Sequence, residues 1–188
     1  TLYNTYGEHF DCNAVGGCYK RNTLMIAARY GRTDCITTLH NIYGDRIDCN
    51  AIDCNNYNAL MIAAMHNQID CITTLYKIYG DKINYNAIDK DNNNILMIAA
   101  RYGYIDCITT LHNIYGDKID CNVNDRNALM IFANNGHSDC IKKLYELFHD
   151  KVDDKVQNAL IAFALNGHSD CITALYNIYG DRIDCNAV

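Results

Sequence analysis

The sequence predicts an all-α fold, a solenoid of helix-turn-helix repeats with short hairpin or turn connections. Near-copies of one segment begin at Asn22, Asn58 and Asn94, about 36 residues apart, and this self-similarity is typical of a stacked repeat array. Two further copies begin at Asn127 and Asn158 after shorter steps. Each copy holds two runs with the apolar spacing of a helix, and a turn separates the two runs.

The copies divide the whole chain into a single array. A partial repeat, 1–21, precedes the repeats 22–57, 58–93, 94–126, 127–157 and 158–188. The chain begins inside the second helical pattern of one repeat and stops just after that of another, whereas intact arrays normally end in complete repeats with polar caps. We therefore expect residues 1–188 to be an excerpt of a longer protein.

The first helix of each repeat is predicted to be short and buried on all sides. Residues 96–100 read LMIAA, which suits a helix packed on both flanks. The Asn before each run is a predicted N-cap, because its side chain can accept hydrogen bonds from the unpaired amides of the first turn. These residues are Asn22, Asn58, Asn94, Asn127 and Asn158.

The second helix is predicted to start near Asp106 in the repeat 94–126. An Asp in the first turn of each copy complements the helix dipole. A glycine is expected to end the helix in the left-handed conformation, at Gly44, Gly80, Gly116 and Gly180. The helix carries one apolar stripe, formed by Cys107, Ile108, Leu111, Ile114 and Tyr115.

The connections between repeats are polar and rich in Asn. Residues 53–57 and 89–93 are too short for a helix and predict turns or hairpins. The connections into the last two repeats shrink to residues 123–126 and 155–157, and there Phe132 and Phe163 replace an Ala of the first helix. We expect these bulkier helices to change the curvature of the stack near residues 123–127.

These motifs resemble the ankyrin repeat family. The helix-opening TPLHxAA motif of that family corresponds to NTLMIAA, NALMIAA and NILMIAA here, and its Gly-His pair to residues 136–137 and 167–168. The resemblance covers essentially the whole chain and implies an ankyrin-type solenoid that serves as a protein–protein interaction scaffold. This sequence departs from the motif in one respect that affects bonding. Met or Ile replaces the His in every copy, so the hydrogen bonds that His makes in the family are expected to be absent.

Charge and hydropathy narrow the classes of partner. The chain has 16 Lys and Arg against 22 Asp and Glu, a net charge of −6, which argues against a nucleic acid partner because phosphate binding needs a basic face. No stretch of about 18 apolar residues occurs, so no membrane insertion is expected.

The eleven cysteines are interpreted as core residues. Nine occupy two repeat registers, one with Cys35, Cys71, Cys107, Cys140 and Cys171, the other with Cys12, Cys49, Cys121 and Cys185. Cys18 and Cys54 lie outside both registers and are expected in exposed hairpins. Unpaired cysteines favour a reducing compartment such as the cytoplasm.

The sequence predicts no catalytic, cofactor or metal site. The chain lacks the CxxC and HxxxH spacings of zinc sites, and no nucleotide-binding or hydrolase motif is present. His137 with Asp139, and His168 with Asp170, suggest acid–base work, but their place in the turn between helices favours a role in fixing the backbone. We therefore predict that the chain is not an enzyme.

In the family that the chain resembles, partners bind at hairpin tips and at the ends of the first helices. Tyr30, His66 and Tyr102 are predicted to line up roughly 8–10 Å apart, next to Arg29 and Arg101. The hairpins add Tyr19, Arg21, Cys54, Asn55, Asp91 and Asn93 as exposed candidates. The predicted partner-binding residues are Arg29, Tyr30, Tyr57, Met65, His66, Lys90, Arg101, Tyr102, Asn134, Asn135, Leu165 and Asn166.

Three functional hypotheses follow. The first is a scaffold that binds a partner protein on the concave face of the array. The alternative is the recognition arm of a larger enzyme or secreted effector, whose catalytic domain lies outside these residues. The third is a metal- or redox-responsive array that uses the exposed cysteines.

Overall fold

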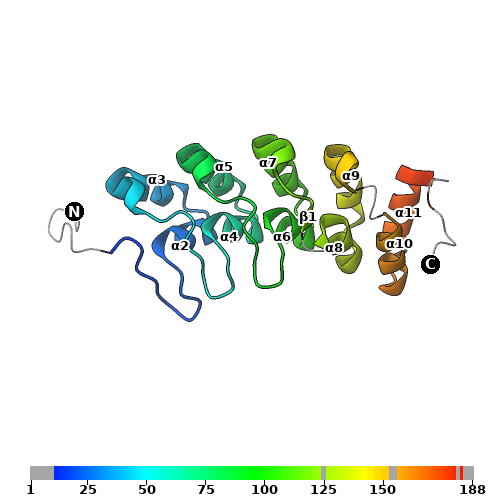
Figure 1. Ribbon diagram of the computed structural model, residues 1–188, viewed down its shortest axis with the longest axis horizontal. Coiled ribbons are helices and arrows are strands. Elements are labelled where there is room, and N and C mark those ends of the chain that lie inside the picture. The colour runs from blue at the N-terminus through cyan, green and yellow to red at the C-terminus, as the bar shows by residue number, and fades with distance from the viewer. Residues whose placement is uncertain (1–10, 124–125, 153–155, 181–182, 184–188) are drawn as a thin grey trace. The chain divides into compact units, whose positions relative to one another are not determined.

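The structure, a computed structural model, describes residues 11–123, 126–152, 156–180 and 183. By contacts the chain divides into two compact units, Thr1–Ala87 and Ile88–Val188. Each unit is built from pairs of helices, as predicted, and the short connections between them are turns and hairpins (Figure 1). The predicted single array over residues 1–188 stays a prediction.

The first unit contains two complete helix pairs. In Figure 1 the first helices of the pairs lie beside each other in one layer and the second helices lie beside each other in another. A single turn of 3-10 helix follows each second helix. The elements are α2 (Thr23–Arg29), α3 (Thr33–Tyr43), η2 (Gly44–Arg46), α4 (Ala59–Met65), α5 (Ile69–Tyr79) and η3 (Gly80–Lys82).

The second unit repeats this two-layer arrangement with three pairs. A two-residue antiparallel hairpin leads into its second pair, with Asn122 opposite Asn127 and Val123 opposite Arg126. The elements are α6 (Ile95–Tyr102), α7 (Ile105–Tyr115), η4 (Gly116–Lys118), β1 (Asn122–Val123), β2 (Arg126–Asn127), α8 (Ala128–Asn135), α9 (Ser138–Val152), α10 (Val156–Leu165) and α11 (Ser169–Tyr179).

The first helices α4 and α6 are buried along most of their length, as predicted, but the prediction is wrong for α2 and α10, where Ile26 and Ile161 are exposed. Every residue from Ile95 to Ala100 is buried in α6, and Phe132 and Phe163 are fully buried in α8 and α10. The predicted curvature change near residues 123–127 stays a prediction.

Three of the five predicted N-caps are confirmed. The Oδ1 atoms of Asn22, Asn58 and Asn94 accept the third backbone amides of α2, α4 and α6 at 2.9, 2.9 and 3.0 Å. The side chain of Asn127 lies outside the described part of the molecule. The prediction for Asn158 is wrong, as is the predicted hairpin at residues 155–157, because α10 already begins at Val156 and Asn158 is an exposed residue inside it.

The second helices carry the predicted stripe and the predicted Asp. Cys107, Ile108, Leu111 and Tyr115 are buried in α7, and Asp106 lies in its first turn. The glycines end these helices, but not in the left-handed conformation. Their φ is +52° to +54° with ψ between −130° and −133°, a backbone shape close to the first central position of a type II′ turn. The prediction of left-handed caps is therefore wrong for them.

Asparagines link neighbouring repeats at the exit of each second helix. In the first unit Asn13 Nδ2 donates to the Arg46 carbonyl at 2.8 Å, and Asn13 Oδ1 accepts the amide of Asp48 at 2.9 Å. One repeat later, Asn50 makes the same two bonds to the Lys82 carbonyl and the Asn84 amide. In the second unit Asn122 Nδ2 donates to the Lys151 carbonyl. We call Asn13, Asn50 and Asn122, with these bonds, the asparagine ladder. The sequence patterns did not predict it.

Most cysteines of the two registers are buried, as expected. The exception is Cys35, which is exposed on α3, whereas Cys71 at the same repeat position is buried on α5. The expectation for Cys35 is therefore wrong, because α3 has no helix on its preceding side in the described part of the chain. Cys18 is exposed and Cys54 is half-buried. Cys185 lies outside the described residues.

Candidate functional site

A groove of about 340 Å³ in the second unit gathers predicted binding residues from two neighbouring repeats. The end of α6 contributes Arg101, and α8 contributes Asn134 and Asn135. The remaining lining residues are Asp91, Asn93 and Ile131. The groove therefore joins a turn between repeats to the ends of two first helices, the two regions that were predicted to bind a partner. It offers one cation, one carboxylate and several amides around an apolar side chain.

The turn that carries Asp91 and Asn93 is held by a buried carboxylate. Asp89 Oδ1 accepts the backbone amides of Asp91 at 2.9 Å and of Asn93 at 2.8 Å. Asn92 adopts a positive φ of 61° within this turn, which Asn tolerates better than most residues. Asp89 thus fixes the part of the groove that faces α8. Asn93 was predicted to be exposed, and this is wrong, because it is buried against Asp89.

The backbone at the end of α6 is held by the next repeat. Gly103 ends this helix in the left-handed conformation, with φ 70° and ψ 28°. His137 Nε2 lies 3.0 Å from the carbonyl oxygen of Arg101, and a Cβ atom on Gly103 would lie 2.7 Å from His137 Nδ1. The His in the turn between helices therefore fixes the backbone at Arg101, as the sequence suggested.

Two of the asparagines at the helix ends donate hydrogen bonds to carbonyls of their own helices. Asn135 Nδ2 donates to the Ile131 carbonyl at 2.7 Å, and Asn166 Nδ2 donates to the Ala162 carbonyl at 2.8 Å. Asn166 Nδ2 also lies 3.3 Å from Asn134 Oδ1. Asn134, Asn135 and Asn166 are nevertheless exposed, so the structure joins these predicted residues into one continuous polar edge.

In the first unit the predicted residues form a smaller cluster at the end of α2. The Arg29 guanidinium lies 5.5 Å from the centre of the Tyr30 ring, a cation–π distance, and Tyr30 is exposed. His66, at the same position of the next repeat, is half-buried. Burial lowers the pKa of His66, and the charges of Arg29 and Arg21 lower it further, which favours the neutral ring.

A buried ion pair holds the connection between the first two repeats. Arg21 Nε donates to Asp53 Oδ2 at 2.9 Å, and both side chains are buried. Asp53 Oδ1 also accepts the amides of Asn55 and Tyr57 at 2.8 and 3.1 Å, which positions the half-buried Tyr57. Arg21 was predicted to be exposed, and this pairing makes that prediction wrong. We did not single out Asp53 or Asp89 from the sequence as residues that stabilise turns. Their pattern could have indicated this role, because both stand at the same repeat position before an Asn-rich segment, where an Asp commonly accepts local backbone amides.

The structure does not bring all predicted residues together. Lys90 is exposed and does not line the groove. Tyr102 stacks on Tyr104, with ring centres 5.6 Å apart. Leu165 is the most exposed large apolar side chain of the described residues, and Met65 is half-buried. The alignment of Tyr30, His66 and Tyr102 in one row stays a prediction.

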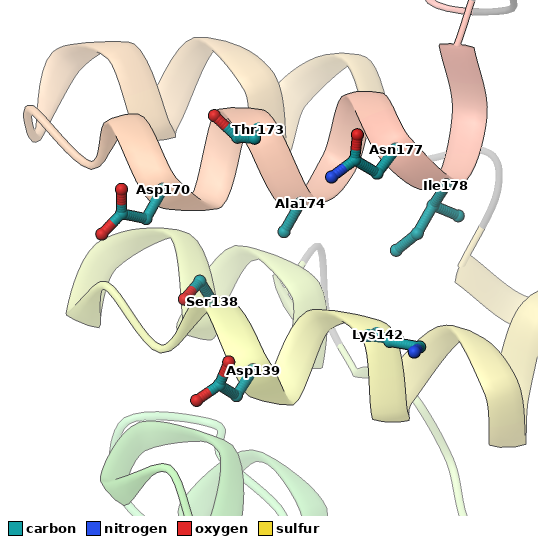
Figure 2. A pocket seen from close by; sticks show the side chains of 8 residues that line it. All are labelled: Ser138, Asp139, Lys142, Asp170, Thr173, Ala174, Asn177 and Ile178. Carbon is teal, nitrogen blue, oxygen red and sulfur yellow. The ribbon is translucent and has the colours of Figure 1, made fainter.

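A second groove, of about 640 Å³, lies between the second helices α9 and α11. Figure 2 shows Asp139 and Lys142 on one wall, with Asp170, Thr173 and Asn177 on the other. Ser138, Ala174 and Ile178 complete the lining. Its charges are mixed, and none of its residues was predicted to bind a partner.

The buried thiols are poor candidates for chemistry. Burial raises the pKa of Cys71 to about 11 and the pKa values of Cys107, Cys121 and Cys140 to about 12. Nucleophilic attack and metal binding both need the thiolate, so these four cysteines suit packing. Among the described residues, no group of three or more His, Cys, Asp or Glu lies close enough to hold a metal ion. No helix in the same part of the chain is long and apolar enough to cross a membrane.

Comparison with known proteins adds an independent result. A family model that describes ankyrin repeats (3 copies) matches three overlapping parts of the chain, residues 2–89, 24–125 and 96–187. No curated protein matches the chain in sequence. Among solved structures 433 chains match, so the fold is widespread and does not by itself identify a partner. One of them, the crystal structure of the human ASB11 ankyrin repeat domain, matches with a TM-score of 0.67 and 18% identity, over 84% of this chain and 69% of that chain.

Proposed function

Since the chain belongs to the ankyrin repeat family, we propose that it is a scaffold whose partner protein binds along the hairpin tips and the ends of the first helices. Ankyrin repeats are generally protein–protein interaction modules, and ankyrin repeat domains are typically non-catalytic. The concave face of the array is the predicted docking surface. The proposal concerns which residues of this chain make the contact.

The groove of the second unit is the observation that carries this proposal. It combines Arg101 with Asn134 and Asn135 on two successive repeats, next to the rigid turn at Asp91. A turn held by a buried carboxylate loses little freedom when a partner binds, which favours affinity. Amide and guanidinium donors spaced along an edge suit an extended segment with carboxylate or backbone carbonyl acceptors.

The first unit supports the same proposal with an aromatic ring and a cation in place of amides. Tyr30 is exposed, and the Arg29 guanidinium lies over its ring. Tyr and Arg are among the residues most often found at binding hot spots. The proposed partner is therefore an extended protein segment that carries acidic or aromatic side chains.

Peptide display on the immobilised chain, followed by affinity measurements on the selected peptides, tests this proposal. Tyr30→Ala, Tyr102→Ala and Arg101→Ala are compared with wild type by fluorescence anisotropy. We expect at least one of these variants to lose about 2 kcal/mol of binding free energy, the size of an interface hot spot. The melting temperature should stay nearly unchanged, because all three side chains are exposed.

Lys142→Ala is the matched control, since Lys142 is an exposed cation that lies in the groove between α9 and α11. Its affinity for the selected peptides should equal that of wild type. The proposal is wrong if Lys142→Ala weakens binding while the three face variants do not. Unfolding of Tyr30→Ala or Tyr102→Ala without a selective loss of binding would show that these rings stabilise the stack instead.

A further inference from the structure

The groove of the second unit that contains Arg101 holds two opposite charges that do not neutralise each other. Arg101 and Asp91 both line this groove, and both side chains are exposed. Among the described residues neither side chain has an ion-pair partner. Both charges are therefore available to a ligand, and a ligand that approaches one of them also approaches the other.

This combination of charges is absent at the same positions of the neighbouring repeats. Met65 in the preceding repeat and Asn134 in the following one occupy the position of Arg101. Asn55 occupies the position of Asp91 in the preceding repeat, and the connection into the following repeat is shorter. The two charges therefore do not result from the duplication of one repeat.

The end of α8 adds one donor and one acceptor to the groove. Asn135 Nδ2 donates to the Ile131 carbonyl, so the Oδ1 atom of Asn135 remains as an acceptor. Asn134 Oδ1 lies 3.3 Å from Asn166 Nδ2, so the Nδ2 atom of Asn134 remains as a donor. Together with the two charges, these amides suit a ligand whose donors and acceptors lie side by side.

The size of the groove makes both charges act on one bound group. A volume of about 340 Å³ is roughly 7 Å across, so any charge inside it lies within the ~8 Å screening length of physiological salt from both side chains. A carboxylate attracted to Arg101 is therefore also repelled by Asp91, and like charges at such distances oppose binding. The net charge of −6 adds long-range repulsion of purely acidic segments. A cation beside the carboxylate offsets both repulsions.

We propose that the groove selects protein segments in which an acidic and a basic side chain lie next to each other. The carboxylate pairs with Arg101 and the cation pairs with Asp91, while Asn134 and Asn135 bond to polar groups beside the pair. The inference rests on the proposed function, and it narrows the acidic or aromatic partner segment to one whose charges are balanced at this repeat. Segments with two like charges here are rejected, because one of the charges meets its own sign.

Random peptides displayed on phage, selected in parallel on wild type, Asp91→Asn and Arg101→Gln, test this proposal. On wild type the selected peptides should be enriched in neighbouring acidic and basic residues relative to the unselected library. On Asp91→Asn the acidic residue should stay enriched and the basic residue should not, and Arg101→Gln should give the opposite result. Both positions are exposed, so circular dichroism spectra and melting temperatures should match those of wild type.

Binding affinity then tests the pairing with Asp91 directly. In a peptide selected on wild type, Gln replaces the basic residue, and fluorescence anisotropy compares both peptides on wild type and on Asp91→Asn. Either change alone should weaken binding at least about tenfold. The two changes together should weaken it little further, because both remove the same pair.

Asp106→Asn and Lys142→Gln are the matched controls, since each removes an exposed charge on a second helix, outside this groove. Both controls should select the same kinds of peptide as wild type and bind the chosen peptide with wild-type affinity.

The possible failures of this inference and of the proposed function differ. Peptides that lose affinity on Arg101→Gln but bind Asp91→Asn as tightly as wild type, without enrichment of basic residues, would overturn the inference alone. Peptides that weaken on Tyr30→Ala and respond to neither groove variant would also overturn only the inference. A library that yields no binder, or binders insensitive to Arg101→Gln, Tyr30→Ala and Tyr102→Ala, would contradict the proposed function and the inference with it.

Discussion

Asn94 and Asn158 occupy the same position of the repeat, yet they have opposite roles. Asn94 is fully buried, its Oδ1 accepts the Met97 amide, and its Nδ2 donates to the Asp120 carbonyl at 2.6 Å. Asn158 is exposed inside α10 and caps nothing, because that helix begins two residues earlier at Val156. The surrounding motifs, NILMIAA and NALIAFA, are otherwise alike.

The connection before the Asn explains the difference. Before α6 the turn held by Asp89 delivers Asn94 with an extended backbone, φ −87° and ψ −178°, the conformation that an N-cap requires. Before α10 the connection is shorter, and the backbone is already helical at Val156. The comparison teaches that the turn, and not the Asn itself, sets where a first helix starts.

The largest expected effect comes from removing the carboxylate of such a turn. Asp53→Ala leaves Arg21 buried without its partner and deprives the amides of Asn55 and Tyr57 of their acceptor. Breaking a buried pair in this way costs about 3–5 kcal/mol, and urea denaturation measures the loss. Asp120→Ala is the control, because Asp120 is exposed and accepts the Asn122 amide. An equal loss in both variants would contradict a special role for the buried turn.

The second effect extends the comparison to a cysteine position. Cys35 and Cys107 are equivalent, but Cys35 is exposed and Cys107 is fully buried. Burial raises the pKa of Cys107 to about 12, so its thiol stays protonated at pH 8. Mass spectrometry after labelling at that pH should show Cys35 modified at least about a hundred times faster than Cys107, since the reactive species is the thiolate.

Cys18 should react as fast as Cys35, because it is also exposed. Cys121 and Cys140 should react as slowly as Cys107, because burial raises their pKa values to about 12 as well. Equal rates at all these thiols in the native protein would mean that the repeats open faster than the reagent reacts.

The smallest effect tests the two asparagines directly. Asn94→Ala should lower the free energy of unfolding by about 1–2 kcal/mol, since it removes an N-cap. Asn158→Ala should change stability by no more than about 0.5 kcal/mol, because Ala is a better helix former than Asn at an exposed interior position. Thermal and urea unfolding of both variants measure the difference. A similar loss at Asn158 would show that it caps α10 in solution.

The repeating features of the fold could be predicted because they depend on local pattern. The apolar periodicity predicted the helix pairs, and the Asn before each run predicted three caps. The failures depend on neighbours in space. Arg21 was taken as a surface residue because its partner Asp53 lies one repeat away, and Cys35 was taken as buried because its equivalents are.

The candidate site was predictable in its residue types and less so in its geometry. Arg101, Asn134 and Asn135 were named from helix ends alone, and they do line one groove. The sequence offered no reason to separate these three residues from Lys90, which lies outside the groove. The hydrogen bonds of Asn135 and Asn166 to their own helices were also unpredictable, because they depend on side-chain conformations at the helix ends.

The asparagine ladder bears on how such an array can change in length. The side chains of Asn13 and Asn50 bond to backbone atoms of the next repeat, the carbonyls of Arg46 and Lys82 and the amides of Asp48 and Asn84. Every residue offers the carbonyl, and every residue except proline offers the amide, whatever its side chain. A repeat that is duplicated, deleted or exchanged therefore finds the same partners in any neighbour, and no matching substitution is needed on the other side.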